Sequence, residues 1–141
     1  MFSPALSRHG PNAFSSTYRQ VGIETGASTA SPHQLILMLF DGFQESLAQA
    51  KGAIAANNRE TKSTAITRAM RIINEGLRGA LNLDAGGGLA ADLDSLYGYI
   101  TVRLSHANIQ NDSKSLDECR DLMEPIRTAW IGIGGRVEGS Q

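Results

Sequence analysis

Apolar residues recur every three or four positions over residues 32–56, which predicts an amphipathic α-helix there. Ser31 suits the N-cap, because its hydroxyl can accept a hydrogen bond from a first-turn N–H, and Pro32 suits the first helical position. The expected core stripe comprises Leu35, Ile36, Leu39, Phe40, Phe43, Leu47, Ala50 and Ile54. At about 100° per residue, Leu37 and Met38 project away from that stripe. We therefore expect something else to cover them.

The same spacing predicts helices over residues 58–83 and 89–108. Asn58 is suited to cap the first of these, and the glycines at 86–88 predict a turn between the two. We expect the first helix to bury Ile66, Ala69, Met70, Ile73, Leu77 and Ala80. We expect the second to bury Leu89, Leu93, Leu96, Tyr97, Ile100, Leu104 and Ala107.

A fourth helix is predicted to begin at Ser115, which forms a capping-box pattern with Glu118. Pro125 lies inside this helix, and because proline removes one backbone hydrogen bond we expect a kink there. Glycines at 132, 134 and 135 are expected to end the helix. Its expected core face is Cys119, Leu122, Met123, Ile126, Trp130 and Ile133.

Apolar and polar residues do not alternate for long enough anywhere to predict a strand. The sequence therefore predicts an all-α fold, an antiparallel four-helix bundle. We expect a bundle domain over residues 31–133, a flexible N-terminal arm over residues 1–30, and a disordered tail over residues 134–141. A short extra helix is compatible with residues 13–21 of the arm.

Two of the predicted helices carry apolar or small residues on a second side, away from the core stripe. On residues 58–83 this side comprises Ala65, Ile72, Gly76, Gly79 and Leu83. On residues 89–108 and just beyond, it comprises Tyr99, Val102, His106 and Ile109. With Leu37 and Met38, these residues favour a groove that takes a partner helix. The alternative is irregular packing with a few tolerated exposed apolar residues.

Composition narrows the range of partners and locations. The formal net charge of −1 leaves no basic field for nucleic acid and no polybasic membrane patch. The N-terminus has no apolar run of signal-peptide length, and the longest apolar run, residues 35–40, is far below the roughly 20 residues of a membrane span. Cys119 is the only cysteine, which fits an intracellular protein. We expect a cytoplasmic location.

The sequence contains no motif of a catalytic, metal or cofactor site. The histidines at 9, 33 and 106 form no metal-ligand spacing, and no phosphate-binding glycine loop is present, so we expect no enzyme, metal or cofactor. His106 leaves one alternative, a histidine phosphotransfer module. Such modules usually place lysine and glycine after the histidine, whereas Ala107 and Asn108 follow here.

The chain resembles the flagellin-specific export chaperone family, FliS. The shared pattern is Tyr18-Arg-Gln-Val, Ile23, Thr29-Ala-Ser-Pro-His-Gln-Leu-Ile-Leu-Met-Leu-Phe-Asp-Gly, Ala69-Met-Arg-Ile-Ile-Asn-Glu-Gly-Leu, Leu81-Asn-Leu-Asp, Leu96-Tyr-Gly-Tyr-Ile, Leu104, Ala107-Asn108, Asn111-Asp112 and Ala129-Trp130. It covers about residues 18–130. Pro125, the glycines at 86–88 and the extension before Tyr18 depart from the family pattern.

The resemblance implies a cytosolic chaperone that binds the disordered C-terminal segment of flagellin, prevents premature polymerisation and assists delivery to the export gate, the cytoplasmic domain of FlhA. It also implies that the N-terminal arm can lie over part of the client groove and take part in docking to the gate, a role that falls here to Tyr18, Val21 and Ile23. Asn108 matches the family's Ala-Asn pair. It could bond the client backbone or, equally, cap the helix over residues 89–108.

Overall fold

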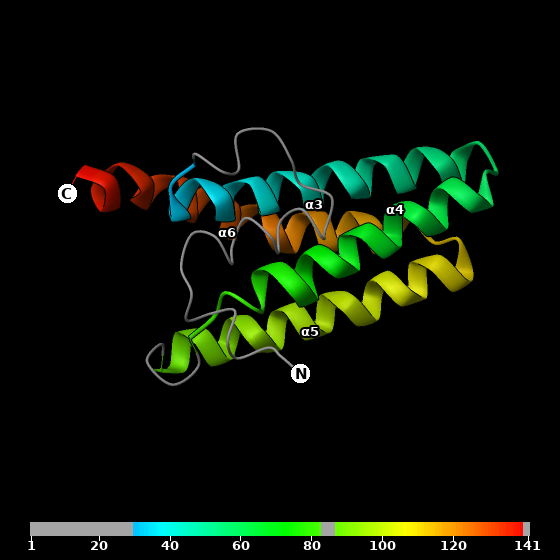
Figure 1. Cartoon of the computed structure of the whole chain (residues 1–141). Helices are drawn as coiled ribbons and strands as arrows, with labels where there is room; N and C mark the ends of the chain where they lie inside the picture. The colour runs from blue at the N-terminus through cyan, green and yellow to red at the C-terminus, as the bar shows by residue number, and fades with distance from the viewer. Residues whose placement is uncertain (1–29, 83–86, 140–141) are drawn as a thin grey trace.

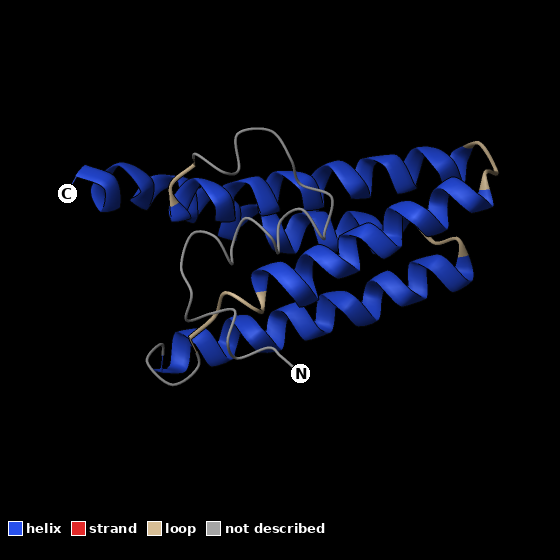
Figure 2. Cartoon of the chain, viewed as in Figure 1, coloured by secondary structure: helices blue, strands red, loops and turns tan. Residues whose placement is uncertain are grey.

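The computed structural model describes residues 30–82 and 87–139, and these residues form four long helices and one short π-helical segment, with no strand. The elements are α3 (Pro32–Ala55), α4 (Arg59–Arg71), η1 (Ile72–Leu77), α5 (Gly87–Gln110) and α6 (Ser113–Gly139). Figure 1 shows successive helices running in opposite directions, and Figure 2 shows the short turns between α3 and α4 and between α5 and α6. Since α3 and α5 each contact both α4 and α6, the predicted antiparallel four-helix bundle is confirmed.

The helix starts of α3 and α4 are set by local side chains, as predicted. Ser31 Oγ accepts a hydrogen bond from the Gln34 backbone N–H, and the Gln34 side chain accepts one from the Ser31 N–H, which completes a capping box. Asn57 ends the turn after α3 with a positive φ of 56°. Asn58 Oδ1 then accepts from the Thr61 N–H at 3.1 Å and caps α4.

The core lies between the helices along the predicted stripes, with three exceptions near helix ends. Ala80, which we expected to be buried, is exposed just after η1. Leu89, which we expected to be buried, is 71% exposed in the first turn of α5. Ile133 is likewise exposed near the end of α6. The fully buried large side chains are Leu35, Leu39, Phe40, Phe43, Ile66, Ile72, Ile73, Ile100, Leu104, Leu116 and Met123.

The second predicted helix differs from expectation in its last third. The α-helix ends at Arg71 and continues as the π-helix η1, in which the Arg78 N–H bonds the Ile73 carbonyl oxygen at 2.8 Å. The placement of Ile72 off the core was wrong, because its side chain is 0% exposed. η1 packs against both α3 and α5, so a wider sector of it is covered than a single α-helical stripe predicts.

Gly76 and Gly79, which we placed on the second side of this helix, have structural roles within the chain. A Cβ added to Gly76 would lie 2.9 Å from Leu39 Cδ1, so this glycine permits the close approach of η1 to α3. A Cβ on Gly79 would lie 2.8 Å from the Glu75 carbonyl oxygen, so glycine suits the turn that leaves η1.

The predicted ends of α6 were also wrong. The helix begins at Ser113, and the side chain that accepts from its first turn is Asp112, which takes the Lys114 N–H at 3.0 Å. Ser115 is fully buried and donates to Asp112 Oδ2 at 3.0 Å. The backbone stays helical through the glycines at 132, 134 and 135 to Gly139, because glycine weakens a helix by about 1 kcal/mol without forbidding it. Pro125 lies within α6, and the kink there stays a prediction.

Candidate partner-binding surfaces

One face of α5 presents large apolar side chains that the described residues leave about half or more exposed. Tyr99 is 46% exposed, Val102 64% and Ile109 75%, and His106 is exposed beside them. We call these four residues the α5 stripe. The residues between them, Ile100, Leu104 and Ala107, are fully buried against the bundle. The prediction that this helix has separate core and outer faces is therefore confirmed.

Polar contacts fix the margins of the α5 stripe. The Tyr99 hydroxyl donates to Glu118 Oε2 at 2.5 Å, and Arg103 Nε donates to Glu118 Oε1 at 2.8 Å. The Tyr99 hydrogen bond and then Arg103 lower the pKa of the Glu118 carboxyl. His106 Nε2 lies 3.3 Å from Asp112 Oδ2. The stripe therefore has an apolar centre and a rim in which the acidic groups are already bonded.

Asn108 lies at the α4 side of α5 and is engaged within the chain. Its carbonyl oxygen accepts a hydrogen bond from Lys62 Nζ at 2.8 Å, and its Oδ1 accepts from Ser63 Oγ at 3.3 Å. The expectation that Asn108 caps this helix was wrong, because α5 continues to Gln110 and Asn111 follows with a left-handed φ of 54°. Its bond to a client backbone stays a prediction.

The remaining predicted partner residues fall in three settings. Leu37 is half-buried on α3, whereas Met38 packs against the core cluster, so the bundle itself covers part of Met38. Ile72 is buried, as described above. Tyr18, Val21 and Ile23 lie outside the described residues.

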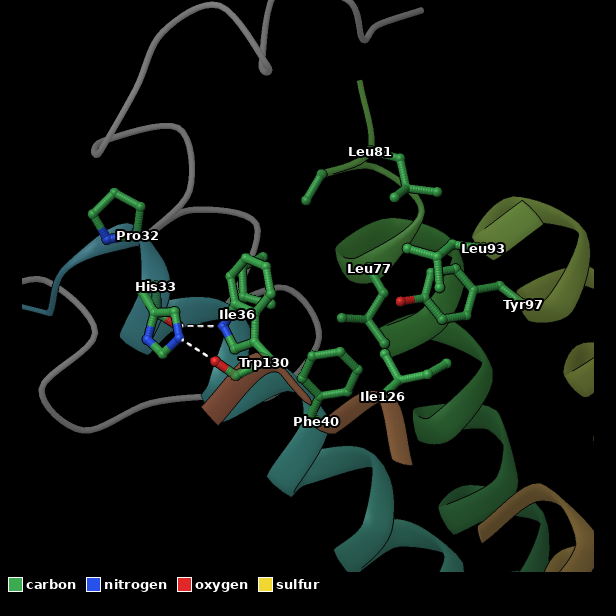
Figure 3. A pocket seen from close by; sticks show the side chains of 11 residues that line it. Pro32, His33, Ile36, Phe40, Leu77, Leu81, Leu93, Tyr97, Ile126 and Trp130 are labelled. Atoms are coloured by element: carbon green, nitrogen blue, oxygen red, sulfur yellow. Dashed lines mark hydrogen bonds between the residues drawn. The ribbon is translucent and has the colours of Figure 1, made fainter. Parts of the chain in front are cut away.

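A hollow at one end of the bundle was not predicted. It has a volume of about 280 Å³, and we call it the end pocket. Its walls come from the start of α3, the end of η1 and the turn after it, the first half of α5, and the second half of α6 (Figure 3). The lining residues are Pro32, His33, Ile36, Phe40, Leu77, Ala80, Leu81, Leu93, Tyr97, Ile126 and Trp130. None of them is Asp, Glu, Lys or Arg.

His33 and Trp130 join α3 to α6 at the rim of this pocket. Their rings stack with centroids 4.9 Å apart and an interplanar angle of 6°. Trp130 Nε1 donates to the His33 carbonyl oxygen at 3.0 Å, and His33 Nε2 lies 2.7 Å from the Trp130 carbonyl oxygen, for which it is the donor (Figure 3). The two residues therefore have a structural role in holding the helix ends together.

The described residues contain neither a candidate metal site nor a reactive thiol. They contain no group of three His, Cys, Asp or Glu side chains that could hold a metal ion. Burial raises the pKa of the Cys119 thiol to about 12, so this side chain is not a thiolate nucleophile at neutral pH. Across residues 30–82 and 87–139, no helix has the length and apolar character needed to span a membrane.

Comparison with known proteins identifies one family. The family model described as flagellar protein FliS matches residues 14–137. The flagellar secretion chaperone FliSB of Pseudomonas aeruginosa is 45% identical over 116 residues, which are 82% of this chain and 91% of that protein. The flagellar secretion chaperone FliS of Salmonella typhimurium is 39% identical over 120 residues, 85% of this chain and 89% of that protein. The FliS of Escherichia coli is 37% identical over 113 residues, 80% of this chain and 83% of that protein.

Proposed function

The chain belongs to the FliS family of flagellar proteins, and we propose that it is a flagellar secretion chaperone that binds the C-terminal segment of flagellin in the cytoplasm. Binding covers surface that flagellin uses to polymerise. The complex is then delivered to the type III export gate through the cytoplasmic domain of FlhA. The curated relatives are named as chaperones, which supports a binding role rather than an enzymatic one.

The α5 stripe is the observation that carries this proposal. Three of the six exposed large hydrophobic side chains among the described residues lie on it, at positions 99, 102 and 109. Such clustering on one helix face is typical of an interaction surface rather than of scattered exposure. With His106, the spacing is three, four and three residues, which matches the apolar face of an amphipathic helix laid alongside. We therefore infer that the client forms a helix on α5.

A disordered client loses conformational entropy when it becomes ordered, so it needs extensive apolar contact to bind. The α5 stripe supplies one apolar surface, and the end pocket supplies a second on the same molecule. Neither surface includes an Asp, Glu, Lys or Arg side chain. This pattern favours an apolar client segment over an acidic or basic one.

Circular dichroism tests the proposal. The C-terminal segment of the flagellin from the same organism is expected to be disordered alone and to gain helix when mixed with this chain, so that the spectrum of the mixture exceeds the sum of the parts. The Val102→Asp variant serves as the matched control, because it places a charge at the centre of the α5 stripe. An additive spectrum at concentrations where the wild-type chain binds would contradict coupled folding.

No observation favours the phosphotransfer alternative. His106 is exposed, but its Nε2 lies 3.3 Å from an Asp112 oxygen, and Ala107 and Asn108 follow it in place of lysine and glycine. A phosphohistidine donor is expected to leave this chain unlabelled.

A further inference from the structure

The carboxylate of Glu118, on α6, holds two side chains of α5 at the edge of the α5 stripe. Its Oε2 accepts a hydrogen bond from the Tyr99 hydroxyl at 2.5 Å, and its Oε1 accepts one from Arg103 Nε at 2.8 Å. Hydrogen bonds to an ionised group are stronger than those between neutral groups. The Tyr99 ring, although the residue is 46% exposed, is therefore held at its outer end.

Arg103 extends these contacts to the other end of the stripe. Its Nη2 donates to Ser115 Oγ at 2.7 Å, and Ser115, which is fully buried, donates to Asp112 Oδ2 at 3.0 Å. His106 Nε2 lies 3.3 Å from the same oxygen. The two members of the stripe that carry polar groups are thus joined to the start of α6 by one network. We call it the edge network, and it comprises Tyr99, Arg103, His106, Asp112, Ser115 and Glu118.

Stability alone is a weak explanation for the Glu118 contacts. The side chains of Arg103 and Glu118 are 29% and 37% exposed, and exposed ion pairs contribute little to the free energy of folding. By contrast, an exposed aromatic ring that is already fixed in one orientation loses less conformational entropy when a partner packs against it. A binding surface therefore gains affinity when residues behind it hold the rotamers of its side chains.

We propose that Glu118 is a positioning residue for client binding, which holds the Tyr99 ring in the orientation against which the client helix packs. Arg103 in turn keeps the Glu118 carboxylate in place. This inference rests on the proposed function and adds to it a residue of α6, outside the α5 stripe. Glu118 acts through Tyr99, so its contribution to binding requires the Tyr99 hydroxyl.

Two substitutions in the full-length chain separate positioning from a general effect on the fold. Glu118→Ala removes both acceptor oxygens, whereas Tyr99→Phe removes only the hydroxyl donor. The matched control is Asp117→Ala, because Asp117 is the neighbouring carboxylate on α6 and accepts from Lys51 of α3 at 2.8 Å. We expect Glu118→Ala and Asp117→Ala to lower the thermal midpoint by similar small amounts, since each removes one ion-paired carboxylate.

Each variant is titrated with a peptide of the flagellin C-terminal segment at a temperature at which all of them are folded. We expect Glu118→Ala and Tyr99→Phe each to bind about fivefold more weakly, because the ring at position 99 must then be ordered on binding. Asp117→Ala should bind like the wild type. The double variant of Glu118 and Tyr99 should bind about as weakly as either single variant, since both substitutions remove the same bond.

The absorbance of tyrosine phenolate gives a readout of the Tyr99 bond itself. The hydrogen bond to Glu118 raises the pKa of Tyr99. In an alkaline titration, one tyrosine should therefore ionise at lower pH in Glu118→Ala than in the wild type, with no such shift in Asp117→Ala. The shift should be absent when Glu118→Ala is made in the Tyr99→Phe chain, which assigns it to position 99.

Three outcomes would overturn this inference and leave the proposed function standing. The first is wild-type affinity in Glu118→Ala. The second is a loss of about 25-fold in the double variant, because independent losses multiply and Glu118 would then act without Tyr99. The third is an unchanged tyrosine titration, which would mean that the bond is not made in solution. If the wild-type chain does not bind the peptide at all, the proposed function fails and this inference fails with it.

Discussion

At the scale of single residues, two positions that a helical wheel treats alike lie in opposite environments. Val102 is 64% exposed on α5, whereas Ile72 at the start of η1 is 0% exposed. The difference arises because η1 lies between α3 and α5, while the described residues leave the outer side of α5 exposed. Exposure in the folded structure, rather than hydrophobicity along the sequence, therefore separates candidate binding residues from core residues.

Val102→Asp is expected to leave the thermal midpoint nearly unchanged, because surface substitutions usually alter stability by less than about 0.5 kcal/mol. It should weaken flagellin binding by about thirtyfold, since losing a desolvated contact can cost about 2 kcal/mol. Ile72→Ala is the contrasting variant and should destabilise the fold by about 2–5 kcal/mol. A thermal melt of each variant measures its stability, and a titration with the flagellin segment measures its binding. If the Val102→Asp chain is stable and binds flagellin normally, the client binds another face of the bundle.

At the scale of elements, α5 and α6 are held together by charged side chains as well as by their core. Glu118 accepts hydrogen bonds from Tyr99 and Arg103, and Arg103 Nη2 also donates to Ser115 Oγ at 2.7 Å. The Ser115 bond lowers the pKa of Asp112, and the Lys51 bond at 2.8 Å lowers that of Asp117. These carboxylates connect α6 to α5 and α3.

The fold should therefore lose stability in acid. A carboxyl whose pKa is lower in the folded chain than in the unfolded chain stabilises the folded state when it is ionised. Its contribution to the free energy of unfolding is complete above the unfolded pKa and is lost as the pH falls through the folded pKa. The ordinary pKa of a glutamate carboxyl is 4.5 and that of an aspartate carboxyl is 3.8, so the loss of stability begins as the pH falls to near these values. Thermal midpoints recorded from neutral to acidic pH should fall more steeply for the wild type than for Glu118→Gln. Parallel curves would mean that the Glu118 bonds contribute nothing to stability.

Two glycines in helical segments should respond to alanine in opposite ways. At Gly52 in α3 an added Cβ meets nothing within 4 Å, so Gly52→Ala should stabilise the chain by about 1 kcal/mol. At Gly76 the Cβ would meet Leu39 Cδ1 at 2.9 Å, and overpacking of this kind costs about 1–3 kcal/mol, so Gly76→Ala should be destabilising. Urea unfolding of the two variants measures both changes. If Gly76→Ala proved as stable as Gly52→Ala, Leu39 would have room to move away.

The features that the sequence predicted well are those set by neighbouring residues. The Ser31 capping box and the Asn58 cap are local, so α3 and the start of α4 were placed correctly. The α5 stripe was predicted because helical spacing alone separates Val102 from Leu104. The π-helical segment over Ile72–Leu77 was missed, since the apolar spacing there fits an ordinary α-helix as well. The end pocket was missed because its walls come from four separate segments, and only the fold brings them together.

At the scale of the whole molecule, the two apolar surfaces differ in kind. The α5 stripe is an outer face on the second half of α5, while the end pocket is a hollow between helix ends that includes the first half of α5 (Figure 3). Residues 1–29 are joined to the described chain at Ala30, two positions before Pro32 of the pocket lining. A tethered segment acts at a high effective concentration and can compete with a client that binds from solution.

The proposed arm contact of Tyr18, Val21 and Ile23 predicts a change in dye binding. Replacing all three residues by serine in the full chain should raise the fluorescence of a hydrophobic dye, because apolar surface that they shield becomes accessible. The thermal midpoint of the bundle is expected to stay the same, which separates unshielding from unfolding. Unchanged dye fluorescence would count against a shielding arm.

Trp130 is the only tryptophan in the chain, and its indole forms part of the wall of the end pocket, stacked on His33. All of the intrinsic tryptophan fluorescence therefore comes from this site, so it reports whether the pocket is occupied without any added label. A partner that fills the pocket replaces water around the indole and should shift the emission to shorter wavelength, whereas a partner confined to the α5 stripe should leave the spectrum unchanged. Trp130 fluorescence recorded during binding can therefore show the order in which a client occupies the two surfaces.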